Sequence, residues 1–191
     1  MALPQSFYDR DPAAVARELL GQKLVVCKGQ SLEGKIVETE AYYGLSDPAS
    51  RASQDGMSQR SRWMWDAAGT SFVYMVHGYW LFNVITEGQG TPSGVLIRAV
   101  EPLTGIEVMR RRRGRDRLRD LTSGPGKLTV ALDIDRSDNG RAVYDPGSPV
   151  RIERAGTVND GEVATSRRIG VTHDLPRDLR FYVAGNPYVS R

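Results

Sequence analysis

The chain has 191 residues, of which 40% are hydrophobic and 26% charged, and this composition suits one globular domain with its own buried core. A single cysteine excludes an intramolecular disulfide and an iron–sulfur cluster, and the two histidines beside it are too few for a conventional zinc site. The formal net charge is only +3, yet just four of the 26 basic residues are lysines; the rest are arginines, whose planar donors match phosphate.

The beginning of the chain carries no recognisable targeting signal. Residues 1–20 lack a basic start followed by an apolar run, so they do not read as a signal peptide. No stretch approaches the roughly 20 apolar residues of a membrane-spanning helix. We therefore expect a soluble protein that works inside the cell.

The first 43 residues contain one helix signal and two strand signals. Asp11 and Pro12 open a helix that is over by Gly21, because aspartate caps helix N-termini, proline suits the first helical position and glycine ends helices. Two adjacent strands follow, over residues 23–27 and 34–43, with a turn between them.

The rest of the chain contains more strands than helices. Residues 44–62 are polar and rich in Gly and Ser, which predicts a long loop that is either functional or disordered. A helix is predicted over residues 104–113, and residues 121–132 form a loop that opens another. Further predicted strands cover residues 70–78, 79–86, 94–103, 149–155, 166–171 and 179–185. Most neighbours are linked by short turns, so the sequence predicts one α+β domain, residues 1–191, with a curved, mainly antiparallel sheet and surrounding helices.

The segment VETEAYYG places two carboxylates and an aromatic ring together. Side chains alternate along a strand, so Glu38, Glu40 and Tyr42 share one face. On pattern alone, such a face is more often the solvent-facing side of a strand. The segment runs directly into the long loop, however, and functional sites tend to be built where loops meet strands.

Three other segments have a structural and a functional interpretation. Most aromatics of FVYMVHGYWLFN belong in a core, but Tyr74 and His77, beside a glycine turn, could stack on nucleic-acid bases. SGPGKLT fails the phosphate-loop pattern at Leu128, although a glycine-rich turn opening a helix can still hold an anion. Seven arginines within residues 110–119 are either a solvated helix face or a patch that contacts phosphates.

Eight stretches, in order along nearly the whole chain, match a known family. They are LLGQKLV, GKIVETEAYYG, DPAS, AAGTSFVYMVHG, NVIT, GVLIRAVEPL, SGPGKL and RFYVAGNPYVS. In these stretches the chain resembles the alkyladenine (3-methyladenine) DNA glycosylases of the mammalian type, whose fold agrees with the one predicted above. The resemblance implies a monomeric enzyme that needs no cofactor or metal and acts on double-stranded DNA containing a damaged purine. It would work at the nucleoid of a prokaryote or in the nucleus of a eukaryote.

The resemblance also implies roles for individual residues. Glu40 would be the general base that activates water, and Arg98 would lie near that water and the nucleotide backbone. Tyr42 and Tyr74 would sandwich the flipped base. Asn83 would disfavour guanine by crowding its 2-amino group.

The chain departs from the family at three places in the site. Arg51 stands where the family has a pocket histidine; it would either repel cationic bases or point to a phosphate. His77 stands where the family has a tyrosine that fills the gap left by the flipped nucleotide. Between Gly78 and Asn83 the chain is one residue shorter than the family, so Tyr79 is an alternative candidate for this wedge. The positions expected to lie close to the DNA backbone are Thr122, Ser123, Gly124 and Lys127.

One carboxylate is enough for the chemistry that the resemblance implies. An N-alkylated purine is already positively charged and leaves readily, whereas enzymes that cleave O-glycosides need a second carboxyl as the acid. A neutral lesion such as hypoxanthine needs a proton donor that the sequence does not identify. A lyase would need an amine, and no lysine lies near the ETEAY segment. We therefore expect simple hydrolysis that leaves an abasic site.

Two other functions are compatible with the same features. A similar sheet occurs in the C-terminal domain of methionyl-tRNA formyltransferase, so the chain could be a nucleic-acid-binding module without catalysis. A metal-dependent nuclease could use Glu38 and Glu40. Substitution of Glu40 and activity in EDTA separate these alternatives from a glycosylase.

Overall fold

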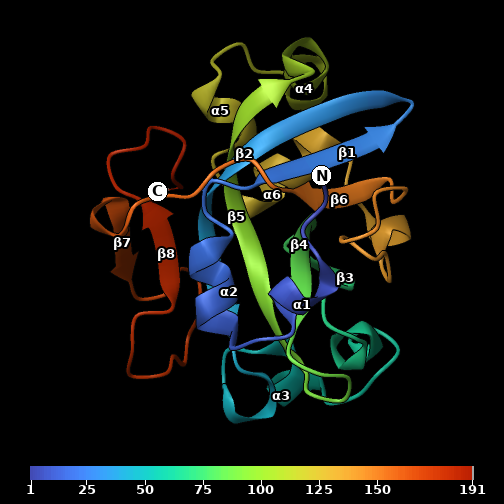
Figure 1. Ribbon diagram of the computed structural model, residues 1–191, viewed down its shortest axis with the longest axis vertical. Coiled ribbons are helices and arrows are strands. Elements are labelled where there is room, and N and C mark those ends of the chain that lie inside the picture. Colours follow the sequence, from blue (N-terminus) through green and yellow to red (C-terminus); the bar gives the residue numbers. More distant parts are fainter. Residues whose placement is uncertain (191) are drawn as a thin grey trace.

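The longest strand, β2 (Gln30–Tyr42), is at the centre of a computed structural model that describes residues 1–190 (Figure 1). One edge of β2 pairs with β5 (Ser93–Thr104) along most of its length. The opposite edge pairs first with β1 (Lys23–Lys28) and then with β8 (Arg180–Val183). The register of β2 against β5 shifts between Ile36 and Thr39, where the partner on the other edge changes. Such irregularities bend a strand, and they let β2 belong to both halves of a curled sheet.

Across residues 1–190 the sheet has eight strands, and every pairing between them is antiparallel. Six strands follow the order β3-β4-β5-β2-β1-β6, and β8 joins β7 to β2. The remaining strands are β3 (Ser71–Val76), β4 (Tyr79–Thr86), β6 (Val150–Glu153) and β7 (Val163–Ser166). This arrangement confirms the predicted α+β fold with a curved antiparallel sheet.

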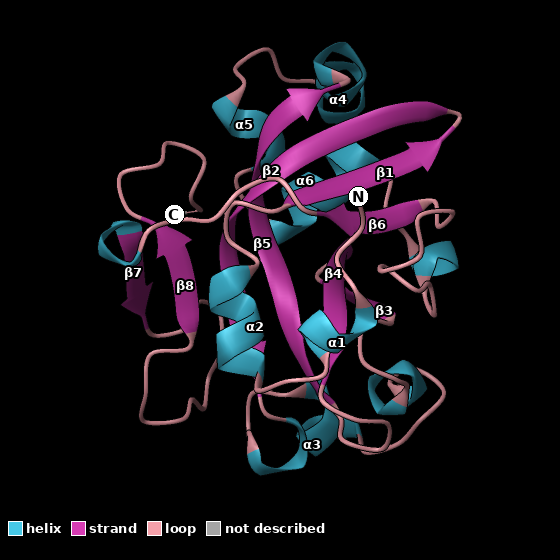
Figure 2. Ribbon diagram, in the orientation of Figure 1, coloured by secondary structure: helices cyan, strands magenta, loops and turns pink. Residues whose placement is uncertain are grey.

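Short helices surround the sheet (Figure 2). Helix α2 packs on β2 and β5, whereas α6 packs on β4 and β5. As predicted, the Asp11 side chain caps α2, accepting hydrogen bonds from two backbone N–H groups. The helices are α1 (Gln5–Tyr8), α2 (Pro12–Glu18), α3 (Arg51–Asp55), α4 (Ile106–Arg113), α5 (Arg119–Thr122) and α6 (Pro125–Leu132). None of the helices described here is long and apolar enough to cross a bilayer.

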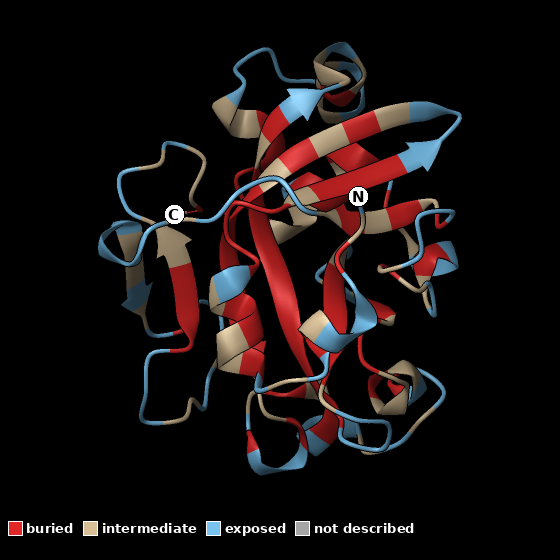
Figure 3. Ribbon diagram, viewed as in Figure 1, coloured by how far each residue is buried: buried red, intermediate tan, exposed pale blue. Residues whose placement is uncertain are grey.

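The core lies between the sheet and these helices, and β5 is buried along most of its length (Figure 3). Ile36, Ile97, Phe82 and Leu128 are fully buried members of one hydrophobic cluster. Burial of such side chains contributes about 1.5–3 kcal/mol each, so this cluster is the main support of the sheet that carries the site.

Two sequence-based predictions need correction. The strand predicted over residues 166–171 is wrong: β7 ends at Ser166, and the segment that follows is a loop tied down by side-chain ion pairs. Residues 44–62, predicted as one long loop, contain helix α3 and a short 3₁₀ turn, Gly44–Ser46, and a second 3₁₀ turn, Arg62–Trp65, begins at their end.

Candidate active site

Glu40 is a buried carboxylate held by three donors. It lies near the end of β2 and is fully shielded from solvent. Its Oε1 accepts a hydrogen bond from the backbone N–H of Ile169 (2.8 Å), while Oε2 accepts from the Tyr42 hydroxyl (2.8 Å) and from Nη1 of Arg98 (3.2 Å). Burial raises the pKa of this carboxyl, and the three donors oppose the rise. Because a carboxylate oxygen can accept two hydrogen bonds, Oε1 retains the capacity to accept one from water.

Glu38 is a second buried carboxylate on the same face of β2. Its Oε1 accepts from Nε of Arg98 (2.9 Å), Nε of Arg180 (2.7 Å) and Oγ of Ser190 (2.7 Å). Its Oε2 accepts from the backbone N–H of Ser190 (2.6 Å). Arg98 therefore bridges both carboxylates, and Glu38 fixes the orientation of its guanidinium group.

Burial of both carboxylates differs from what the strand pattern favours. Alternation correctly places Glu38, Glu40 and Tyr42 on one face, but this face is covered by β8, the loop after β7 and the C-terminal segment. Arg98 and Arg180 make the burial tolerable, because a buried carboxylate needs a charged partner and hydrogen bonds.

A cleft of ≈ 710 Å³ lies beside the groups that bind the Glu40 carboxylate. Its lining includes Tyr42, Arg98 and Ile169, the three residues bonded to the Glu40 carboxylate. Tyr74 also contributes to the wall. The carboxylate is thus one layer behind the surface of a cleft that is large enough for a flat heterocycle.

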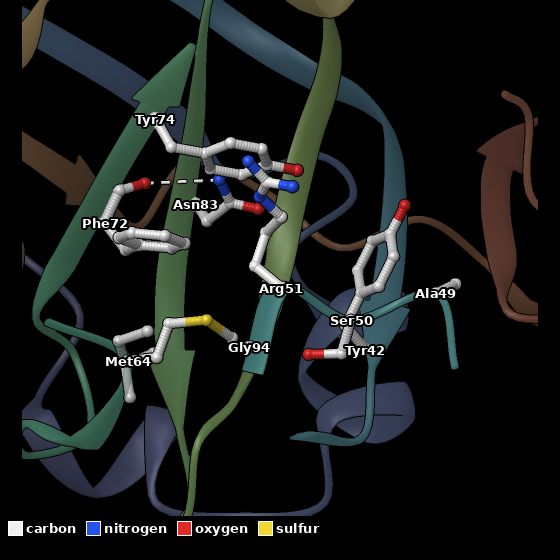
Figure 4. A pocket seen from close by; sticks show the side chains of 10 residues that line it. Tyr42, Ala49, Ser50, Arg51, Met64, Phe72, Tyr74, Asn83 and Gly94 are labelled. Carbon is white, nitrogen blue, oxygen red and sulfur yellow. Dashed lines mark hydrogen bonds between the residues drawn. The ribbon is translucent and has the colours of Figure 1, made fainter. Parts of the chain in front are cut away.

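Tyr42 and Tyr74 each have an arginine against the ring. The guanidinium carbon of Arg51 lies 5.2 Å from the centroid of Tyr74, and Figure 4 shows the two groups against each other. Phe72 stacks with Tyr74 at 5.1 Å and an interplanar angle of 18°. The guanidinium carbon of Arg168 lies 4.5 Å from the centroid of Tyr42. Burial raises the pKa of Tyr74 to about 12, so its hydroxyl is neutral at physiological pH.

Asn83 lies at the inner end of the site. It lines a small cavity together with Tyr42, Arg51 and Tyr74 (Figure 4). Its side-chain nitrogen donates to the backbone carbonyl of Phe72 (3.2 Å), which fixes the orientation of the amide. The structure thus gathers the four predicted base-binding residues around one space.

The β3–β4 hairpin places both candidate wedge residues at the mouth of the cleft. His77 and Gly78 form its turn with positive φ values of 49° and 83°, and His77 is exposed. Tyr79 is 51% exposed and packs against Gly126, where a Cβ would come within 2.7 Å of it. A side chain at position 126 would therefore displace the Tyr79 ring.

The predicted DNA-backbone residues differ in exposure. Lys127 is exposed and its Nζ lies 3.4 Å from Oγ of Ser123; both residues line a second cleft that also contains Arg117 and Arg119. Gly124 is buried at the N-terminus of α6. Thr122 is fully buried and its hydroxyl donates to the Val100 carbonyl, so its side chain supports this loop from beneath.

The arginine-rich segment is partly occupied by local ion pairs. Arg110 pairs with Glu107 at 2.7 Å and Arg112 with Asp133 at 3.0 Å. Arg110 and Arg112 therefore fit the interpretation as a solvated helix face. Arg117 and Arg119, which line the second cleft, fit the interpretation as a patch that contacts phosphates.

Sequence reasoning missed four residues that contact the Glu40 network: Arg168, Ile169, Arg180 and Ser190. Arg180 and Ser190 lie in the matching stretch RFYVAGNPYVS, but no role was assigned to them, and the segment of Arg168 and Ile169 contains no such motif. They meet β2 only through the fold, from positions more than 120 residues away.

Comparison with known proteins gives a consistent result. The methylpurine-DNA glycosylase (MPG) family matches residues 6–187. A protein from Aeropyrum pernix is 42% identical over 191 residues, covering 99% of this chain and 93% of that protein. A protein from Mesorhizobium japonicum is 45% identical over 182 residues, covering 94% of this chain and 86% of that protein. A protein from Salinibacter ruber is 43% identical over 200 residues, covering 98% of this chain and 96% of that protein. All three carry the provisional name 3-methyladenine DNA glycosylase. The chain therefore belongs to the methylpurine-DNA glycosylase family of DNA repair enzymes.

Proposed function

We propose that the protein is a monofunctional DNA glycosylase of base excision repair, with a base pocket of the mammalian type. It flips an alkylated purine, hypoxanthine or ethenoadenine out of double-stranded DNA and hydrolyses the bond to the sugar. The main support is the position of Glu40 directly behind a cleft lined by Tyr42 and Tyr74. Extruding a base costs a few kcal/mol, and least for a damaged base, so damage itself favours entry.

Glu40 is the proposed general base. A water bound at Oε1 would be deprotonated as it attacks the anomeric carbon, and the negative charge would also stabilise a positively charged sugar. Arg98 supports this role because its positive charge favours the ionised form of a carboxylate whose pKa is raised by burial. Cationic bases need no further acid to leave.

The decisive test is a panel of duplexes, each with one defined lesion, assayed in EDTA. Abasic sites revealed by alkali in the lesion strand, and not in the undamaged duplex, are the expected result. Dependence on added metal would favour a nuclease, and binding without cleavage would favour a non-catalytic module. The two arginines and the serine that already bind Glu38 argue against a metal at that carboxylate.

We also propose that the enzyme hydrolyses without lyase activity and acts as a monomer at the DNA. The described lining of the 710 Å³ cleft has no lysine to form a Schiff base. An enzyme–DNA adduct trapped by borohydride would contradict this. Ser123 and Lys127, with Arg117 and Arg119, are the proposed contacts to the backbone, and binding should weaken steeply with salt.

Arg51 is expected to favour neutral lesions. Its charge lies against Tyr74, at the proposed stacking position, and its ion pair with Asp55 is long at 3.5 Å. Replacing it with histidine should lower the ratio of hypoxanthine to 7-methylguanine excision by about threefold to tenfold, because a weakly screened like-charge repulsion is lost. Arg60→His, an exposed position on the same segment, is the control. An unchanged ratio would assign Arg51 to a phosphate instead.

Tyr79 is expected to be the more important wedge. Its larger ring is half exposed and braced by Gly126, whereas His77 offers a smaller ring. Tyr79→Ala should reduce stable flipping by about fivefold or more, the equivalent of one lost stacking contact. Fluorescence of 2-aminopurine beside the lesion reports flipping, and Met75→Ala on the same hairpin is the control. A larger loss in His77→Ala would reverse the assignment.

A further inference from the structure

Arg168 is the most completely bound side chain near the site. It is fully buried, and all its N–H donors are used. Nη1 donates to Asp47 (2.6 Å) and to the Ala41 carbonyl (2.9 Å), and Nη2 donates to Asp47 (2.8 Å) and Asp174 (2.6 Å). Nε donates to Asp174 (2.9 Å). One guanidinium thus joins three segments, and the one that contains Arg168 and Asp174 lies more than 120 residues from Ala41 and Asp47 in the sequence.

Those three segments are the ones that frame Glu40. Ala41 and Tyr42 end β2, and the Tyr42 ring lies against Arg168. Asp47 holds the start of the following segment, since it also accepts from the backbone N–H groups of Tyr43 (3.0 Å) and Ala49 (3.0 Å). Asp174 closes the loop that begins after β7.

The residue after Arg168 is Ile169, whose N–H binds Glu40. Ile169 is 38% exposed, so its own packing holds this amide less firmly than a buried side chain would. Its segment follows the end of β7 and is outside the sheet. The anchoring of Arg168 is therefore what fixes the position of the amide.

We propose that Arg168 is a positioning residue for catalysis: it holds the Ile169 amide against Glu40 and the Tyr42 ring in the cleft wall. This inference rests on the proposed function of Glu40 as the base. It assigns a catalytic consequence to a residue that contacts neither DNA nor the reacting atoms.

The consequence is a change in how Glu40 titrates. The charged or titratable groups that face it are Arg98, Tyr42, Glu38 and Tyr74. Of the donors that oppose the effect of burial, two depend on Arg168: the Tyr42 hydroxyl, whose ring lies against the guanidinium, and the Ile169 amide, which is in the same loop as Arg168. If that amide moves away, Glu40 becomes harder to ionise, and the acid limb of the rate profile moves to higher pH.

The test compares Arg168→Lys with Arg154→Lys, the same substitution at an exposed arginine outside this loop. Single-turnover excision is measured at saturating enzyme across pH, which removes differences in DNA affinity. Arg168→Lys should be about tenfold slower, with the acid limb about one pH unit higher, as expected for one lost hydrogen bond to a charged group. Arg154→Lys should match the wild type. A folded Arg168→Lys protein with the wild-type rate and profile would overturn the inference.

A second readout does not require activity. In the wild type, the Ile169 amide proton followed by NMR should shift as Glu40 titrates, and in Arg168→Lys this coupling should weaken. Asp174→Asn, which keeps the side-chain size, serves if the lysine variant does not fold, with a smaller effect in the same direction. An Ile169 amide that ignores Glu40 in the wild type refutes the positioning role. Failure of the wild type to excise any lesion refutes the proposed function instead.

Discussion

Replacing Glu40 with glutamine should abolish excision and leave recognition of the damaged duplex intact. The amide has nearly the same shape but cannot take a proton from water, and general base catalysis contributes roughly 10²–10⁴-fold to rate. The single-turnover rate should therefore fall by about 10²-fold or more. Affinity for a lesion duplex should change little, since Tyr42 and Tyr74 line the cleft and Glu40 lies behind it.

The control for this substitution is Glu101→Gln. It makes the same chemical change on β5, where Glu101 forms a partly exposed ion pair with Lys35. It should excise like the wild type. The wild-type rate should decline as the pH falls through the raised pKa of Glu40, because protonation removes the base. A Glu40→Gln enzyme that retains wild-type excision would leave the chain a DNA-binding module or move the base elsewhere.

Removing the carboxylate of Glu38 should have the largest effect on stability. Glu38→Ala leaves Arg180 without its buried partner and frees one side of Arg98. Breaking a buried ion pair costs about 3–5 kcal/mol because the remaining charge is uncompensated. For a protein of this size that corresponds to a melting temperature lower by about 10 °C.

Glu33→Ala is the matched control, since Glu33 is on the same strand and pairs with Lys23 near the surface. Its cost should be about 1 kcal/mol or less. Thermal melts of both variants by circular dichroism make the comparison. Equal melting temperatures for Glu38→Ala and the wild type would show that the network contributes little to folding.

Features of the fold that depend on residues close together in the sequence could be predicted from the sequence. The Asp11 cap, the β3–β4 hairpin and the shared face of Glu38 and Glu40 follow from short patterns. The burial of that face did not follow, because its partners lie between 58 and 152 residues away in the chain. Only the assembled sheet brings them together.

The error at residues 166–171 has the same cause. The segment has the composition of a strand, but its conformation is determined by Arg168 and its two aspartates. Asp47 comes from a segment that sequence reasoning treated as a loop. Interactions between distant segments therefore override local preference at the point where the site is built.

The bond between Ser190 and Glu38 has a consequence for synthesis of the protein. The ribosome synthesises Glu38 early. The bonds from Ser190 that hold Glu38, and through Glu38 orient Arg98, can form only after residue 190 has left the exit tunnel. A nascent chain can therefore form much of the sheet while Arg98 is still incompletely held.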